Sequence, residues 1–121
     1  MEWLNQEVGL FPLWICPLAT THTPQSTLWK LVSHNLYCDI GIFGSVALKE
    51  GSDDTAYNRM IENKMLALGG KKCFYSDSFF SRDTFNRLYN GPEYEAIKKK
   101  YDPQNIFPHV YDKCVKRAYK K

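Results

Sequence analysis

The 121-residue sequence has no long hydrophobic run. Its longest apolar stretch, 11–18, is short and contains Pro12 and Pro17, whereas a membrane-spanning helix needs about 20 apolar residues. The first residues, MEWLNQ, carry an acid and amides where a secretory signal peptide has basic residues before an apolar core. The sequence therefore predicts no targeting or transmembrane segment in this chain.

Cysteine and histidine are sparse and scattered. No cysteine forms a C-x-x-C pair or joins a histidine at metal-ligand spacing. We therefore expect reduced thiols and no metal site among Cys16, Cys38, Cys73, Cys114, His22, His34 and His109.

Charge and composition are ordinary except for the aromatic content. The formal net charge of +3 comes mainly from lysines near the C-terminal end, which we interpret as solvated helix surface that complements helix dipoles. Nucleic-acid binding requires a continuous basic face with exposed aromatics, which this pattern does not offer. The length of 121 residues fits one domain, and a hydrophobic fraction of 44% allows a real core. The aromatic fraction of 15% suits packing on a flat ligand or another domain, or core filling.

Three segments have the pattern of strands. The stretch 11–18 is apolar on both faces, and 36–43 alternates strictly. Its even positions are apolar and are expected to face a helix layer, whereas a mixed set, Tyr37, Asp39, Gly41 and Phe43, is expected to face a ligand or another domain. A third strand is predicted over 72–79, where Tyr75 and Asp77 repeat the Tyr-x-Asp spacing.

Helices are predicted between and after these strands. Asp53 or Asp54 is expected to cap a helix that ends at Gly69-Gly70; its apolar stripe is Tyr57, Met60, Ile61, Met65 and Leu68. Ser81 is expected to cap a helix that Gly91-Pro92 breaks, a second helix runs on to Tyr101, and Pro108 begins the last one.

The order strand, strand, helix, strand, helices predicts an α+β fold. It matches the last four elements of a β-α-β-β-α-β unit. We therefore expect an incomplete ferredoxin-like cap domain, an antiparallel or mixed sheet with helices on one face, plus C-terminal helices. Residues 1–80 would form the partial cap domain and 81–121 a helical tail.

Several sequence blocks resemble delta-24 sterol reductases. They are FPLWICP at 11–17, LYCDIGIFG at 36–44, FYSDSF at 74–79 with Phe85 and Tyr94, and FPHVYDK at 107–113. The blocks cover nearly the whole chain in order. The segment IKKKYDPQNIF at 97–107 resembles a tail shared more widely by flavoproteins of the vanillyl-alcohol oxidase type.

The resemblance implies an oxidoreductase that reduces the side-chain double bond of a sterol, with NADPH reducing FAD and the flavin delivering a hydride. It implies a C-terminal piece that lacks the flavin-binding domain and is inactive alone. That domain and the sterol would be its partners, with no nucleic acid. It also implies an endoplasmic reticulum membrane location, through an N-terminal region absent here.

Hydride addition to an alkene needs a proton donor and a dry, apolar site. We predict Tyr75 and Asp77 as catalytic residues, with Tyr37, Asp39 and Phe43 facing flavin and substrate, from the shared Tyr-x-Asp spacing. The alternative is that the tyrosines pack between domains and the aspartates pair with lysine or cap a turn.

Two other functions are compatible with the sequence. One is a stand-alone ferredoxin-like binding module that presents aromatic residues to a planar ligand or to single-stranded nucleic acid. Asp39 and Asp77 oppose nucleic acid, because they put negative charge on the face that phosphates would meet. The other is the structural product of a truncated gene.

Overall fold

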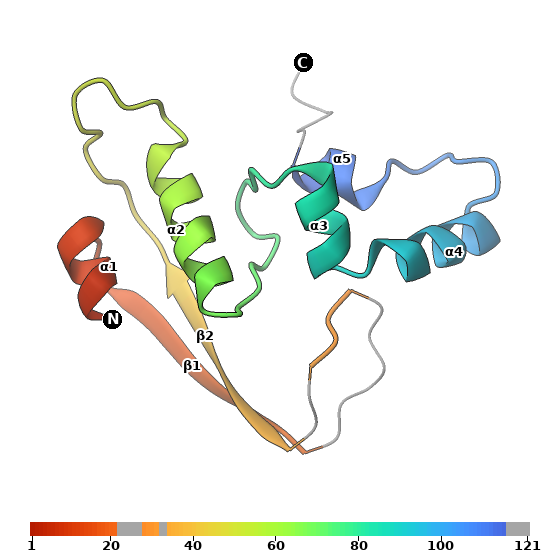
Figure 1. The fold of residues 1–121 in the computed structure, drawn as a ribbon, viewed down its shortest axis with the longest axis horizontal. Coiled ribbons are helices and arrows are strands. Elements are labelled where there is room, and N and C mark those ends of the chain that lie inside the picture. The colour runs from red at the N-terminus through yellow and green to blue at the C-terminus, as the bar shows by residue number, and fades with distance from the viewer. Residues whose placement is uncertain (22–27, 32–33, 116–121) are drawn as a thin grey trace. The chain divides into compact units, whose positions relative to one another are not determined.

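The computed structural model describes residues 1–21, 28–31 and 34–115. Its elements follow the order α1 (Glu2–Glu7), β1 (Leu13–Thr20), β2 (Asn35–Ile42), α2 (Ala56–Ala67), α3 (Arg82–Leu88), α4 (Gly91–Tyr101) and α5 (Val110–Cys114) (Figure 1). The predicted α+β class is confirmed. His22 and the basic residues beyond Val115 lie outside the described residues.

The chain forms two compact units. The first comprises Met1–Gln25 and Leu31–Asp54, and the second comprises Ser26–Lys30 and Thr55–Lys121. The assignment of 1–80 to a cap domain and 81–121 to a tail concerns a larger protein and stays a prediction.

The first unit is a long antiparallel ribbon preceded by a short helix (Figure 1). β1 pairs with β2 from Leu13↔Ile42 to Thr20↔Asn35. The Thr20 hydroxyl closes the far end, because it donates to the Asn35 carbonyl at 3.0 Å and accepts from the Asn35 amide at 3.1 Å. The alternation of 36–43 predicted β2 as a strand, but its apolar even positions are not covered by a helix layer, because Leu36 is 71% exposed and Ile40 45% exposed. The helix α1 had no clear sequence signal.

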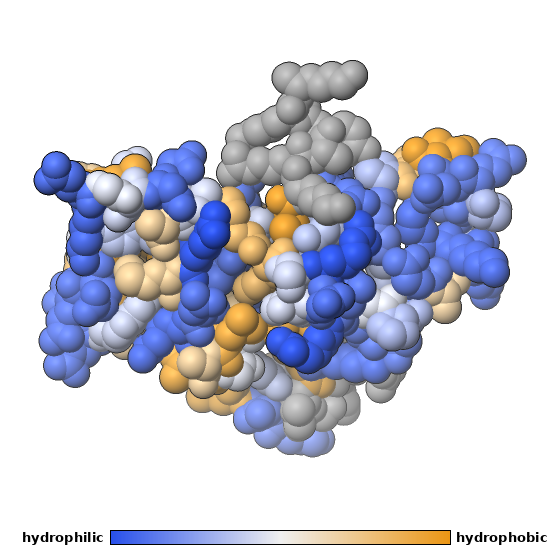
Figure 2. Space-filling view, turned by 45° about the horizontal axis from the view of Figure 1, so that its top comes forward, coloured by the Kyte–Doolittle hydropathy of each residue, from blue (hydrophilic) through white to orange (hydrophobic). Residues whose placement is uncertain are grey.

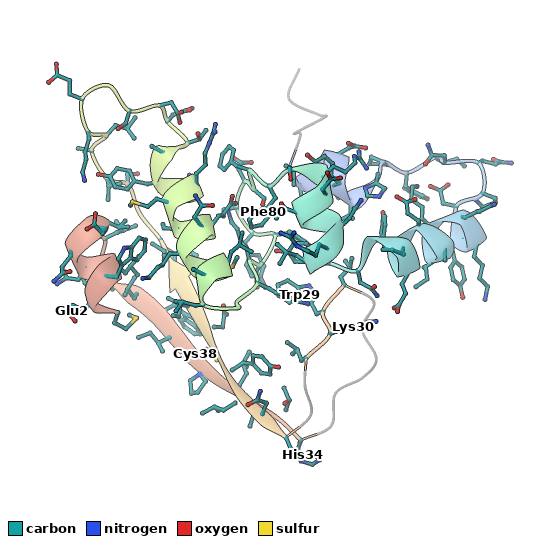
Figure 3. All side chains as sticks on the ribbon, viewed as in Figure 1. Glu2, Trp29, Lys30, His34, Cys38 and Phe80 are labelled. Atoms are coloured by element: carbon teal, nitrogen blue, oxygen red, sulfur yellow. The ribbon has the colours of Figure 1, made fainter. Side chains whose placement is uncertain are left out.

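The second unit is held together by aromatic rings. Phe80, Phe85, Tyr89 and Tyr111 are buried, and Trp29 and Phe74 pack against them. The Tyr89 ring lies 4.6 Å from Phe74 and 4.7 Å from Phe85, between centroids. Figure 3 labels Trp29 and Phe80 of this cluster. Part of the aromatic content of the sequence thus serves as core.

The predicted strand over 72–79 is wrong, because these residues form an irregular loop between α2 and α3. Side chains satisfy part of the loop backbone in place of a neighbouring strand: Tyr89 binds the Lys72 amide and Glu62 binds the Phe79 amide. Within the described residues the sheet has two strands. A ferredoxin-like arrangement is therefore not confirmed, and the sheet is antiparallel rather than mixed.

One of the two helix-cap predictions is confirmed and the other is wrong. Ser81 caps α3 as expected, since its side chain accepts the Thr84 amide. Thr55, rather than Asp53 or Asp54, occupies the N-cap of α2, and Leu68 falls at the C-cap with 75% of its surface exposed.

Glycine and proline separate the remaining helices. Asn90 adopts a left-handed conformation, with φ of 55°, between α3 and α4, and a Cβ on Gly91 would lie 2.7 Å from the Asn86 Cβ. The predicted break at Gly91-Pro92 is thus a tight junction that only glycine fits. The last helix begins at Val110, two residues after Pro108, because the His109 ring accepts the Tyr111 amide as its cap.

Candidate functional site

One face of the ribbon carries three of the predicted site residues. Alternate residues of a strand share a face, so Tyr37 and Asp39 lie with their partners Leu18 and Cys16. A Cβ on Gly41 would lie 2.8 Å from the Phe43 ring. Phe43 therefore folds back over Gly41 onto the face of Tyr37 and Asp39.

This face is open and partly apolar. Trp14, paired with Gly41, is 60% exposed and Phe43 is 71% exposed. Hydrophobic residues reach the molecular surface in several places (Figure 2). An exposed aromatic face is typical of a surface that contacts a flat ligand or another domain. The specific role of Tyr37, Asp39 and Phe43 stays a prediction.

Tyr75 and Asp77 lie in the loop between α2 and α3 of the other unit. Tyr75 is 94% exposed, and the Asp77 carbonyl accepts from the Lys72 ammonium. The two Tyr-x-Asp motifs therefore do not lie on two strands of one sheet, which was the premise of their assignment. Their catalytic role remains untested.

The most buried polar cluster of the second unit was not anticipated. Glu62 is 3% exposed on α2 and accepts from the Lys72 ammonium at 2.7 Å and from the Ser78 hydroxyl at 3.1 Å. The Phe79 amide donates to the same carboxylate. The available signal was a carboxylate beside Ile61 and one turn before Leu66, on the flank of the apolar stripe of α2.

Tyr89 extends this cluster into the aromatic core. Its hydroxyl donates to the Lys72 carbonyl at 2.7 Å and accepts from the Lys72 amide at 3.1 Å. Burial raises the pKa of Tyr89 to about 12, because a phenolate would lose its hydration here. The Tyr89 phenol is therefore a structural hydrogen-bonding group at neutral pH.

A second carboxylate organises the turn after α4. Asp102 accepts from the Lys98 ammonium and from the amides of Ile106 (2.8 Å) and Phe107 (3.0 Å). The Lys98 ammonium, followed by these amides, lowers the pKa of Asp102. The helix expected to run to Tyr101 ends there, with Asp102 at its C-cap, and the Asp102 side chain binds the amides of the turn that follows.

The second unit has a small surface depression of about 170 Å³. Its lining residues are Arg59, Glu62, Asn63, Leu66, Phe79, Phe80, Ser81 and Thr84. Cavities for drug-sized ligands span about 300–1,000 Å³, so this one cannot enclose a sterol or a flavin nucleotide.

Within the described residues, no group of three or more His, Cys, Asp or Glu side chains is placed to hold a metal ion. Among the helices of 1–21, 28–31 and 34–115, none has the length and hydropathy to cross a bilayer.

The chain is similar to sterol reductases over nearly its whole length. The delta(24)-sterol reductase of Homo sapiens is 29% identical over 114 residues, which cover 94% of this chain and 22% of the human protein. The enzyme of Arabidopsis thaliana is 26% identical over 132 residues, covering 96% of this chain and 24% of that protein. A delta(24)-sterol reductase homolog of Caenorhabditis elegans is 24% identical, covering 93% and 21%.

These relatives confirm the resemblance to delta(24)-sterol reductases. The chain spans about a fifth of the length of the relatives it matches. No family model and no solved structure matches it.

Proposed function

We propose that this chain forms part of a FAD-dependent delta(24)-sterol reductase, which reduces the C24–C25 double bond of a sterol side chain with NADPH. The observation that carries the proposal is that seven curated relatives match, and that those from human, worm and plant align with 93–96% of the chain under this name. By the same relationship, the complete enzyme works at the endoplasmic reticulum membrane.

The proposed reaction divides the work between this chain and the rest of the enzyme. FAD, when bound and reduced by NADPH, would supply the hydride for one alkene carbon, and an acid of the protein would donate the proton to the other. The residues that hold FAD lie in the part of the reductase that this chain does not align with, so the chain alone is inactive. Its own contribution to the chemistry is the acid, Tyr75 or Asp77.

A chimera tests this proposal. The matching stretch of the human reductase is replaced by this complete chain. The resulting chimeric protein is assayed for bound flavin and for NADPH-dependent reduction of a sterol that carries the C24–C25 double bond. A second chimera with the C. elegans stretch serves as the control. We expect turnover from both; a flavin-loaded, folded chimera of this chain without turnover, beside an active control, refutes the proposal.

Tyr75→Phe and Asp77→Asn in this chimera test the acid. General acid catalysis contributes about 10²–10⁴-fold to a rate, so we expect loss of kcat on that scale in at least one variant. Tyr101→Phe, which also removes an exposed phenol, is the matched control. Unchanged kcat in both variants would remove Tyr75 and Asp77 from the chemistry.

A further inference from the structure

The loop 72–79 begins and ends on one buried carboxylate. Glu62 Oε1 lies 2.7 Å from the Lys72 ammonium, at the start of the loop. The Phe79 amide, at its end, lies 3.1 Å from Oε1 and 3.2 Å from Oε2. The Ser78 hydroxyl donates to Oε1 at 3.1 Å. Glu62 therefore closes the loop as a clasp.

Further bonds fix the same two ends. The Lys72 ammonium also donates to the Asp77 carbonyl, directly across the loop. Tyr89 binds both the amide and the carbonyl of Lys72, and the Ser78 amide donates to the Cys114 carbonyl at 3.3 Å. Ser78 and Tyr89 are fully buried, and hydrogen bonds are stronger where water is excluded.

The buried Glu62–Lys72 ion pair is not an efficient source of net folding stability. Removing two charges from water carries a desolvation cost that often matches or exceeds their attraction, and apolar replacements of buried ion pairs are often as stable. The geometry that such a pair imposes on the backbone is specific, however. The Glu62–Lys72 pair therefore suits the task of holding the loop in one conformation.

The clasp holds an outward-pointing tyrosine at the tip. Phe74 packs into the aromatic core, with its ring 5.5 Å from that of Phe85, and Ser78 is buried again three residues after Tyr75. Between these anchors Tyr75 is 94% exposed. A large aromatic side chain is thus displayed on a loop whose two ends are fixed.

We propose that Glu62 is a positioning residue of the reductase site, which holds Tyr75 in place for contact with the sterol. The inference rests on the proposed function. A phenol presents a flat apolar ring and one polar group, which suits a ligand that is largely apolar. A loop held in its binding conformation loses less entropy when the ligand binds.

Limited proteolysis of the complete chain tests the clasp. Chymotrypsin cleaves after exposed aromatic residues once the local backbone opens, and Tyr101, also exposed, provides an internal reference. We expect Glu62→Gln to raise the rate of cleavage after Tyr75 at least tenfold relative to cleavage after Tyr101. Global unfolding would accelerate both cleavages, and an unchanged ratio overturns the clasp.

A milder variant covers the possibility that Glu62→Gln does not fold. Ser78→Ala removes one bond to the carboxylate and keeps the Lys72 pair, so we expect a several-fold increase in the same ratio. The double variant Glu62→Gln/Lys72→Met removes both charges and should recover stability without closing the loop. A ratio equal to that of the wild type in the double variant also overturns the clasp.

The human chimera tests the consequence for the sterol. We expect Glu62→Gln to raise the KM for the sterol about tenfold with flavin content unchanged, whereas a purely structural role would lower the flavin content. An unchanged KM beside a loosened loop overturns the positioning role. Proteolysis needs no turnover, so a folded, flavin-loaded chimera without turnover, beside an active control, would refute the proposed function without deciding the clasp.

Discussion

Replacing Tyr89 by phenylalanine removes one hydroxyl from the centre of the second unit. The ring contacts with Phe74 and Phe85 stay in place, so the change leaves no large cavity. The amide and carbonyl of Lys72 lose their partner. Leaving buried polar groups unsatisfied costs about 1–3 kcal/mol, and we expect the free energy of unfolding to fall by that amount at neutral pH.

The same hydroxyl makes the free energy of unfolding fall at alkaline pH. The pKa of Tyr89 is raised by burial from 10.0 to about 12, whereas the unfolded chain releases this proton near the lower value. The contribution of the neutral phenol is therefore complete below pH 10 and is lost as the pH rises through 12. A difference of this size corresponds to roughly 2–3 kcal/mol of unfolding free energy.

Urea unfolding followed by tryptophan fluorescence at pH 9, 10 and 11 measures both effects. Tyr89→Phe should start from a lower stability and decline less steeply with pH than the wild type. Tyr111→Phe is the matched control, because it removes a buried hydroxyl that donates to the Phe80 carbonyl at 3.2 Å and leaves Tyr89 intact. Equal pH slopes for the wild type and Tyr89→Phe would refute this account.

Two other predictions concern the two ends of helix α4. Gly91→Ala places a Cβ 2.7 Å from the Asn86 Cβ, and such overpacking costs about 1–3 kcal/mol; an unchanged Tm would contradict the tight junction. Asp102→Asn should speed hydrogen exchange of the Ile106 and Phe107 amides at pH 7, while the Val110 amide, bound to the Tyr94 hydroxyl, stays protected. Because the pKa of Asp102 is lowered from 3.8, its contribution is present above that pH and is lost as the pH falls further; protection of these two amides that persists in strong acid would contradict the role of the carboxylate.

Part of the candidate site was predictable because it depends on local geometry. The two-residue period of 36–43 placed Tyr37 and Asp39 on one face of a strand, and β2 has that phase. The same period put Phe43 on that face, where its ring lies 2.8 Å from a Cβ built on Gly41. The pairing of Trp14 with Gly41 was not predictable, since register depends on two separate strands.

The conformation of the segment 72–79, in contrast, was not predictable from local geometry. It is rich in aromatic and small polar residues and has a strand-like alternation. Its actual conformation follows from Glu62, which lies ten residues before Lys72, and from Tyr89, which lies ten residues after Phe79. Local sequence propensity does not account for hydrogen bonds between residues that are distant along the chain. The pattern therefore predicted a strand where the chain forms a loop held by Glu62 and Tyr89.

Alone, the sequence determined the α+β class, the strand phase of Tyr37 and Asp39, the Ser81 cap, the Gly91-Pro92 break and the resemblance to sterol reductases. Each of these depends on neighbouring residues or on a linear pattern. Only the tertiary structure decided that Tyr75 stands on a loop and that Glu62 and Tyr89 hold that loop. A buried charge or hydroxyl must find partners wherever the fold provides them, and those partners are distant along the chain.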